Sequence, residues 1–278
     1  FGGDLLKRLL NDIPPPVDAK EDDTQEVISI LKSYYLFDKD IKDYTLARAM
    51  ISKAGLEGTT GLFQLLVKLK AFDENENIDL LRYEIATGFS DEILSTARNL
   101  AFSVQNFSGD GMRKDLTALP LMTIDGQSTL DFDDALSIEK VGDRYRLGIH
   151  IVDVGHFVRK GDVIDQEALS RGSSIYMPDQ KISMLPAELS EGLCSLKAGA
   201  LRPAISTMVN LSHSLEITGY EILPSLINVK HQLTYYDVNL AADQNQDVMV
   251  LREIAQKFRK RRVDAGAVQI SVPEINVW

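Results

Sequence analysis

Cysteine is almost absent from the sequence, since Cys194 is the single one among 278 residues and no internal disulfide can form. This cysteine usage suits a reducing compartment, and we expect a cytoplasmic protein. Long apolar runs are also missing: none approaches the ~18 residues that a membrane-spanning helix needs, and the first residues lack the features of a signal peptide. The sequence therefore predicts neither a disulfide scaffold nor a membrane protein.

Positive charge is scarce as well, because 30 Lys and Arg stand against 41 Asp and Glu, a formal net charge of −11. This balance argues against a protein that coats nucleic acid with its whole surface, although it leaves room for a local basic site. The hydrophobic fraction of 44% and the charged fraction of 26% are ordinary globular values, which excludes disordered and collagen-like chains. The length predicts two folded units, because one domain usually has ~100–200 residues.

Prolines and acidic residues interrupt the first part of the chain between Asn11 and Asp23, so residues 1–23 are predicted to be an N-terminal segment and linker. Beyond them, apolar residues recur at helical spacing in three groups, which predicts three short helices. The groups are Val27, Ile30, Leu31, Tyr34 and Tyr35; Leu46, Ala47, Met50, Ile51 and Ala54; and Leu62, Leu65, Leu66 and Leu69. We interpret residues 24–100 as a winged helix-turn-helix-like domain.

The charge of this first part favours a role in packing or protein contact over direct contact with nucleic acid. Residues 1–120 carry 14 basic and 20 acidic residues. A helix that reads a nucleic-acid groove normally carries clustered Lys and Arg, and Lys68 and Lys70 are too few to form such a cluster.

The residue pattern changes from about residue 101, where residues typical of β-strands become frequent. Residues 119–124 read as a buried strand, and 135–140 are predicted to pair with 144–151 through a Gly142-Asp143 turn. Much later, apolar residues at helical spacing from Val248 to Phe258 predict an amphipathic helix that ends before Gly266. Residues 101–278 are therefore predicted to form a second, mixed α/β unit.

Four aspartates stand within ten residues, on a loop expected between two strands: Asp125, Asp131, Asp133 and Asp134. Two carboxylates about 4 Å apart repel each other by ~4 kcal/mol at an effective dielectric constant near 20, so a partly buried cluster attracts cations. Oxygen ligands select Mg²⁺ or Mn²⁺ over Zn²⁺. Taken by itself, the spacing supports a metal site and a solvated acidic turn equally well.

Two other acidic sites are disfavoured by the residues that follow Asp125. The calcium-loop pattern needs oxygen ligands at alternate positions, a central Gly and a distal Glu, and this stretch does not supply them. A phosphatase of the aspartyl-nucleophile type would usually carry a second Asp where Gln127 stands. The remaining interpretation is an acidic metal site of the kind that hydrolyses phosphodiesters.

The stretch Thr123–Leu136 reads T-I-D, a gap, then D-x-D-D-A, and it resembles the signature of the ribonuclease II family of hydrolytic 3′-to-5′ exoribonucleases. The similarity covers roughly residues 112–278 and continues in order through 148–154, 171–178, 184–196 and 233–235. A helix-turn-helix front end resembles a bacterial subset of that family. The resemblance implies an α+β protein, in which an N-terminal winged-helix-like domain precedes the N-terminal part of a mixed α/β catalytic domain.

By this similarity, the family's four active-site aspartates fall on Asp125, Asp131, Asp133 and Asp134. The resemblance implies that the cluster binds Mg²⁺, with Mn²⁺ as an alternative. Asp125, Asp131 and Asp134 would hold the metal and the terminal phosphate, and Asp133 would be needed most directly for cleavage. The implied partner is single-stranded RNA, degraded to nucleoside 5′-monophosphates.

The resemblance also places RNA-stacking aromatic rings at Tyr176 and Tyr235. Stacking suits a sequence-independent enzyme, because every base has a π-face and each stack contributes ~1–3 kcal/mol. The residues alone favour a different role, a packed tyrosine with a bonded hydroxyl.

Two other features are interpreted as structural, and a third only slightly favours a functional role. His150 and Asp153 are expected to support the fold or the site from outside it, and Cys194 is expected to be a small buried residue. The segment 252–262 has six basic residues and one acid, which slightly favours contact with an RNA backbone over a solvated helical face.

The family's catalytic domain continues past the position of Trp278, where it supplies an essential Arg and further RNA contacts. Residues 272–278 read as a strand, and the first residue is not Met. We therefore expect a fragment of a longer exoribonuclease. The alternative hypothesis is an RNA-binding or assembly scaffold of the same fold without turnover, and the sequence does not identify a protein partner.

Overall fold

The computed structural model describes residues 2–11, 13–14, 16, 20–56, 58–100, 113–178, 180–241 and 245–270. The chain divides into two compact units, Phe1–Thr87 and Gly88–Trp278. The boundary between the units differs from the one predicted between residues 100 and 101. The reason is that helix α6 (Asp91–Asn99) buries Ile93 and Ala97 in the core of the second unit. Sequence periodicity identifies a helix but does not say against which core it packs.

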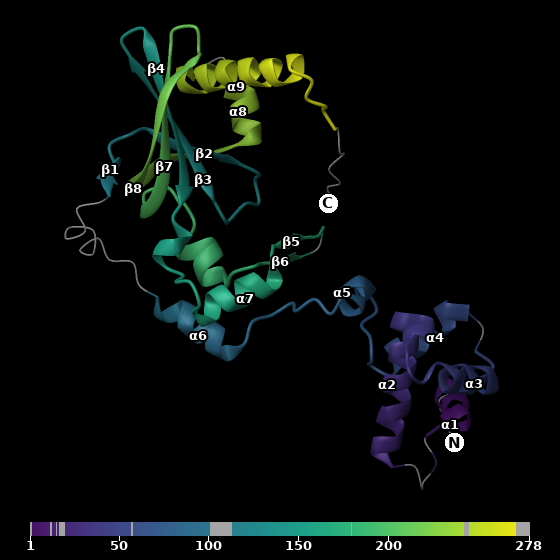
Figure 1. Cartoon of the computed structure of the whole chain (residues 1–278). Helices are drawn as coiled ribbons and strands as arrows, with labels where there is room; N and C mark the ends of the chain where they lie inside the picture. The colour runs from purple at the N-terminus through teal and green to yellow at the C-terminus, as the bar shows by residue number, and fades with distance from the viewer. Residues whose placement is uncertain are drawn as a thin grey trace. The chain divides into compact units, whose positions relative to one another are not determined.

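Every element in the described part of the first unit is helical (Figure 1). The three predicted helices are confirmed as α2, α3 and α4, and they are followed by a short helix, α5, capped by the Asn77 side chain. The helices are α1 (Gly2–Leu10), α2 (Glu21–Phe37), the 3₁₀ turn η1 (Asp38–Asp40), α3 (Tyr44–Ala54), α4 (Gly58–Lys68) and α5 (Ile78–Arg82).

Helix α1 corrects the prediction that residues 1–23 are only a segment and linker. Leu5 and Leu6 are fully buried in the same core as Leu31, Leu65 and Leu66. A nine-residue helix is marginal by its own propensity, so burial of this leucine pair against the other helices must stabilise it.

The second unit is built on a six-stranded sheet of order β1-β8-β2-β3-β4-β7. Strand β8 pairs with β7 along its first part and with β2 along its last part, so the strand order closes on itself. The strands are β1 (Lys114–Asp115), β2 (Leu121–Asp125), β3 (Asp134–Val141), β4 (Arg144–Val152), β7 (Leu201–Leu211) and β8 (Ile217–Thr234), with a separate hairpin of β5 (Ile175–Tyr176) and β6 (Lys181–Ile182).

Helices cover this sheet at one end and on one side (Figure 1). α6, α7 (Val163–Arg171) and the π-helical turn η4 (Glu188–Leu193) pack into one core, whereas α9 (Gln246–Asp264) packs Val248, Leu251 and Ile254 against another. The remaining elements are η3 (Val154–His156) and α8 (Tyr235–Ala241). None of the helices in the described ranges has the length and apolar character to cross a membrane.

Two local predictions for this unit are confirmed, the hairpin and the C-terminal helix. β3 and β4 form the expected antiparallel hairpin, in register from Val141↔Arg144 to Asp134↔Ile151 around the Gly142-Asp143 turn. The predicted amphipathic helix is α9, which ends before Gly266. The strand predicted at 272–278 lies outside the described residues.

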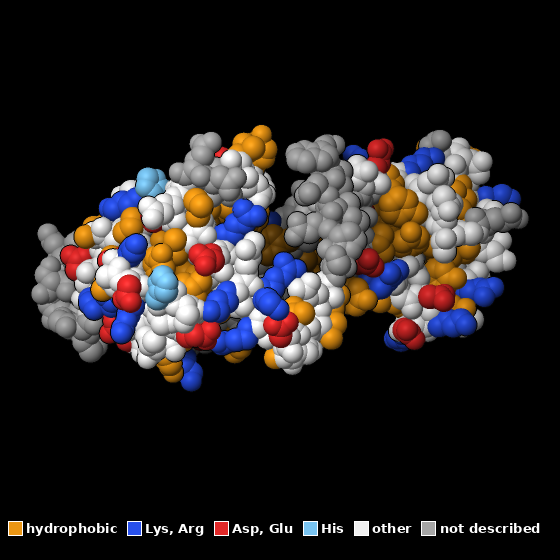
Figure 2. All heavy atoms as spheres, turned by 90° about the horizontal axis from the view of Figure 1, so that it is seen from above, with side chains coloured by type: hydrophobic (Ala, Val, Ile, Leu, Met, Phe, Trp, Pro, Cys, Tyr) orange, Lys and Arg blue, Asp and Glu red, His pale blue; other side chains and the backbone are white. Residues whose placement is uncertain are grey.

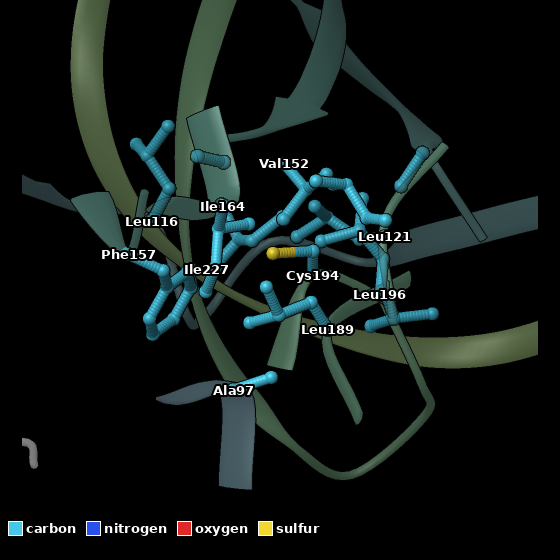
Figure 3. Packing of buried hydrophobic residues seen from close by; sticks show 14 of the residues in the cluster. Ala97, Leu116, Leu121, Val152, Phe157, Ile164, Leu189, Cys194, Leu196 and Ile227 are labelled. Carbon is cyan, nitrogen blue, oxygen red and sulfur yellow. The ribbon is translucent and has the colours of Figure 1, made fainter. Parts of the chain in front are cut away.

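Cys194 lies in the middle of the larger core, where its sulfur is surrounded by aliphatic side chains (Figure 3). The residue is 2% exposed, and burial raises the pKa of its thiol to about 12. A thiol that stays protonated and inaccessible is not a nucleophile, which confirms the interpretation of Cys194 as a small buried residue.

A buried hydrogen-bonded chain crosses the sheet through His150. Ser225 Oγ donates to the Ala204 carbonyl oxygen (3.2 Å), so Ser206 Oγ donates to Ser225 Oγ (2.6 Å) and must accept from His150 Nδ1 (2.7 Å). His150 Nε2 then accepts from Ser137 Oγ (2.9 Å). The direction of this last bond follows from the protonation state, because burial lowers the pKa of His150 to about 4 and the imidazole is then neutral near pH 7, with a lone pair on Nε2.

Gly148 is the residue that leaves room for this chain. A Cβ atom at position 148 would lie 2.3 Å from Ser137 Oγ and 2.5 Å from His150 Nε2. Neither atom can move away, because the two are hydrogen-bonded to each other inside the core. Only glycine fits at this point of β4.

Candidate functional site

The aspartate cluster lies on the connection between two adjacent strands. Asp125 is the last residue of β2 and Asp134 is the first residue of β3, and these strands are antiparallel neighbours with Met122 opposite Leu136. The pairing brings the two ends of the loop to one edge of the sheet, as the sequence predicts. The sheet thus fixes Asp125 and Asp134, and the loop has to place Asp131 and Asp133.

The loop is held by Ser195, which is fully buried. Its hydroxyl donates to the Leu130 carbonyl oxygen (2.8 Å) and accepts from the Phe132 amide (3.1 Å), so both neighbours of Asp131 are fixed. Arg202 in turn donates from Nε to the Ser195 carbonyl oxygen (2.9 Å). The sequence reasoning missed both residues, because their contacts join segments far apart in the chain.

Asp125 is the most constrained carboxylate of the cluster. It is half-buried, and its Oδ2 atom has no hydrogen-bond partner. Burial, followed by the negative charge of Asp134, raises the pKa of Asp125 and outweighs the lowering effect of the nearby Thr123 hydroxyl. A buried carboxylate oxygen without a partner is costly, so this atom is suited to receive a cation.

Asp133 and Asp134 are both exposed residues. Neighbouring atoms displace water from Asp133, and this desolvation is the largest cause of its raised pKa. The negative charges of Asp131 and Asp134 also raise it. The pKa shifts of Asp125 and Asp133 have a common electrostatic part, the mutual repulsion of the clustered carboxylates. A bound cation would relieve it.

Asp131 differs from the other three because it already has a cationic partner. Its Oδ2 atom accepts from Lys181 Nζ (2.7 Å) and from the Tyr176 hydroxyl (3.0 Å). Burial alone would raise the pKa of Asp131, but these hydrogen bonds and one from its own backbone outweigh burial and lower it. Lys181 was not among the residues singled out in the sequence.

The chemistry of the four side chains fits a hard divalent cation, since all donors are carboxylate oxygens and one of them is buried without a partner. Within the described residues, however, no three His, Cys, Asp or Glu side chains are arranged to hold one ion together. The set Asp125, Asp131, Asp133 and Asp134 therefore stays a prediction as a metal site.

The two predicted stacking residues are exposed, so neither ring is packed, although the hydroxyl of Tyr176 is bonded as the packed-tyrosine alternative expects. Tyr176 on β5 is 67% exposed and Tyr235 at the start of α8 is 60% exposed. Thr234, the residue before Tyr235, is paired with Asp125 across β8 and β2, so α8 begins beside the cluster. The next residue, Tyr236, is 61% exposed and was not predicted.

His150 and Asp153 have the supporting roles that the sequence suggests. His150 belongs to the buried hydrogen-bonded chain, and Asp153 forms an ion pair with Arg113 in which both side chains are largely buried. Neither residue offers a free group to the surface.

The basic segment of α9 is partly neutralised by acids nearby. Lys257 and Arg261 both pair with Glu216 (3.2 and 3.0 Å), and Lys260 pairs with Asp264 (2.8 Å). On the face seen in Figure 2, basic and acidic side chains are interspersed. This helix therefore resembles a solvated face more than a dedicated RNA track.

The described arrangement combines an acidic edge that attracts cations with exposed aromatic rings beside it. Rings of this kind can stack on nucleobases, and carboxylates can hold a cation against a phosphate. The site is therefore suited to a nucleic-acid phosphodiester.

Comparison with known families gives two matches. The model described as RNB domain matches residues 113–277, and the model described as Double HTH domain matches residues 3–78. The first match contains every predicted site residue.

Individual relatives agree with these matches. Ribonuclease R of Thermotoga maritima is 40% identical over 201 residues, which are 68% of this chain and 28% of the relative. The solved structure of Mycoplasma genitalium RNase R in complex with ribose methylated single-stranded RNA gives a TM-score of 0.65 at 26% identity and covers 70% of this chain and 32% of that one. Yeast Ssd1, a pseudonuclease, gives a TM-score of 0.53 at 23% identity, over 59% of this chain and 21% of that one, and shows a common fold alone.

The chain is short compared with its relatives. It spans 24%, 20% and 28% of the lengths of the first three curated proteins that it matches.

Proposed function

The chain belongs to the RNB-domain family, and from this premise we propose that it carries the aspartate cluster of a hydrolytic 3′-to-5′ exoribonuclease. The proposed substrate is single-stranded RNA, and the proposed products are nucleoside 5′-monophosphates. The observation that carries the proposal is the hydrogen bond from the exposed Tyr176 to Asp131, because a base stacked on this ring would lie next to the carboxylates.

The proposal gives Asp125 and Asp134 the task of holding Mg²⁺, or Mn²⁺, at the edge of the sheet. The orphaned Oδ2 atom of Asp125 and the mutual repulsion of the two carboxylates support this assignment. A divalent ion bound there would supply charge neutralisation at the scissile phosphate and would make a bound water more acidic.

The other residues bind and orient. Tyr176 and Tyr235 would stack on bases without reading their sequence. Asp133 is exposed on a loop that Ser195 holds in place, so its carboxylate can accept a hydrogen bond from the attacking water and fix its direction. Asp131 anchors the hydroxyl of Tyr176.

Metal uptake should depend on the ends of the two strands. Isothermal titration calorimetry of this chain with Mg²⁺ and Mn²⁺ should show binding that Asp125→Asn combined with Asp134→Asn abolishes, because the substitutions remove one charge from each proposed ligand. The metal should also raise the melting temperature of the wild type, since it binds the folded state. Asp143→Asn, which changes an exposed turn residue, is the control. An unchanged isotherm in the double variant would exclude this site.

The activity itself is tested with 5′-labelled single-stranded RNA and the full-length protein on a sequencing gel. We expect progressive shortening from the 3′ end in Mg²⁺, none in EDTA, and, with internally labelled RNA, nucleoside 5′-monophosphates on thin-layer chromatography. Binding without any shortened product would support the alternative, an RNA-binding scaffold. The fold alone does not separate these functions, because the pseudonuclease Ssd1 shares it.

A further inference from the structure

Lys181 joins the two parts of the proposed site. Its ammonium group lies 2.7 Å from Asp131 Oδ2 and 3.8 Å from Glu191 Oε1, and it lies over the ring of Tyr176 at 5.5 Å from the centroid. The side chains of Lys181 and Asp131 are only 23% and 16% exposed. Partly buried contacts of this kind are less screened by salt than surface ion pairs.

The hairpin explains why lysine and tyrosine meet. Tyr176 on β5 and Lys181 on β6 are directly opposite each other, and the Met177 amide donates to the Gln180 carbonyl oxygen (2.9 Å) beyond this pair. Residues that are directly opposite in an antiparallel pair project from the same face. Asp131 then receives both side chains on a single oxygen atom, Oδ2.

This geometry gives Asp131 a role different from that of Asp125. A carboxylate oxygen that already accepts from an ammonium group and a phenol has less capacity for a metal ion, whereas Asp125 Oδ2 has no partner. Lys181 also offsets one negative charge of the cluster at the place where an anionic RNA end would arrive.

We propose that Lys181 is a positioning residue that locks the Tyr176 ring to Asp131, so that the 3′-terminal base is stacked whether or not a metal ion is bound. The inference rests on the proposed function, because it assigns the 3′ end of RNA to this ring. Lysine covers part of one ring face, and the 67% exposure of Tyr176 leaves surface for a base. The metal is then needed for cleavage and not for capture of the terminus.

The test uses the full-length protein in EDTA and a single-stranded oligoribonucleotide with 2-aminopurine at its 3′ end, because stacking quenches this fluorophore. The wild type should quench it. Lys181→Met should lose most of the quenching and bind the oligonucleotide about tenfold more weakly, within the range of one lost stack. Lys181→Arg should restore both to within about twofold, since it keeps the positive charge.

Three controls make the result specific. Lys160→Met changes the charge equally at an exposed lysine and should behave as the wild type. An oligonucleotide with 2-aminopurine at the 5′ end should report no difference between wild type and Lys181→Met. Asp131→Asn keeps Lys181 but replaces its ion pair at position 131 with at most a neutral hydrogen bond. It should also lose 3′-terminal quenching, so the test does not depend on the folding of one variant.

The outcomes separate the two proposals. Quenching by the wild type that persists in Lys181→Met or in Asp131→Asn overturns the role of Lys181 and leaves the exoribonuclease proposal in place. Quenching by the cleavage-deficient Asp133→Asn variant that is absent in EDTA and appears only when Mg²⁺ is added also overturns it. If the wild type does not quench in EDTA and does not shorten the oligonucleotide in Mg²⁺, both proposals fail.

Discussion

Replacing Asp133 with Asn should lower the rate of RNA cleavage by the full-length protein at least ~100-fold, the size expected when one preorganised charged group is removed from an active site. RNA affinity should stay within about twofold of the wild type. Binding along a nucleic acid comes from phosphate contacts and base stacking, whereas Asp133 would act on the attacking water in the transition state. Loss of a negative charge could only favour an anionic ligand.

Single-turnover gels with 5′-labelled RNA and filter binding in EDTA measure the two quantities separately. Asp143→Asn is the matched control, because it makes the same change at an exposed residue of the β3–β4 turn. Wild-type turnover by Asp133→Asn, or an equal loss of binding and cleavage, would contradict the assignment of Asp133 to chemistry.

Acidification from pH 6.5 to pH 4 should lower the free energy of unfolding by about 3 kcal/mol through His150 alone. Burial lowers the pKa of this residue from 6.5 to about 4 in the folded state, and each unit of difference corresponds to ~1.4 kcal/mol. The sign follows from which state binds the proton. Between these pH values the unfolded chain takes up a proton that the folded chain refuses, so stability is fully present above pH 6.5 and is lost as pH falls.

Urea unfolding of this chain as a function of pH measures the effect. His150→Gln should be less stable at pH 7, because it disturbs the chain of hydrogen bonds with Ser137 and Ser206, but its stability should fall less steeply between pH 6.5 and pH 4. His213→Gln replaces an exposed histidine and should keep the wild-type slope. Equal slopes in His150→Gln and the wild type would show that the pKa of His150 is the same in the folded and unfolded states, against the lowering by burial.

Local patterns were enough to predict much of the fold. The β3–β4 hairpin follows from strand-type residues on both sides of Gly142-Asp143, and α9 follows from apolar residues at helical spacing. In both cases the determining contacts lie within a few residues of each other. Helix α1 was missed because four leucines in a nine-residue segment do not show by themselves whether a core exists to receive them.

The domain boundary and the exposure of the two tyrosines could not be predicted from local sequence patterns. α6 is an ordinary amphipathic helix in sequence, and only its packing shows that it belongs to the second unit. The residue type alone does not show whether a tyrosine ring is packed or exposed. The exposure of Tyr176 and Tyr235 was decided by the hairpin and by α8, which hold them outside both cores.

The sequence by itself determined that four aspartates stand between two strands of an RNB-type domain, because a short loop between antiparallel neighbours must bring its ends together. Only the tertiary structure decided how these carboxylates differ. Asp131 contacts Lys181, which lies 50 residues away in the sequence. The residues on either side of Asp131 are fixed by Ser195, 63 and 65 residues away. Asp125 keeps a buried oxygen atom without a hydrogen-bond partner. A carboxylate's charge and pKa depend on what surrounds it, and sequence spacing does not specify the groups that folding brings there.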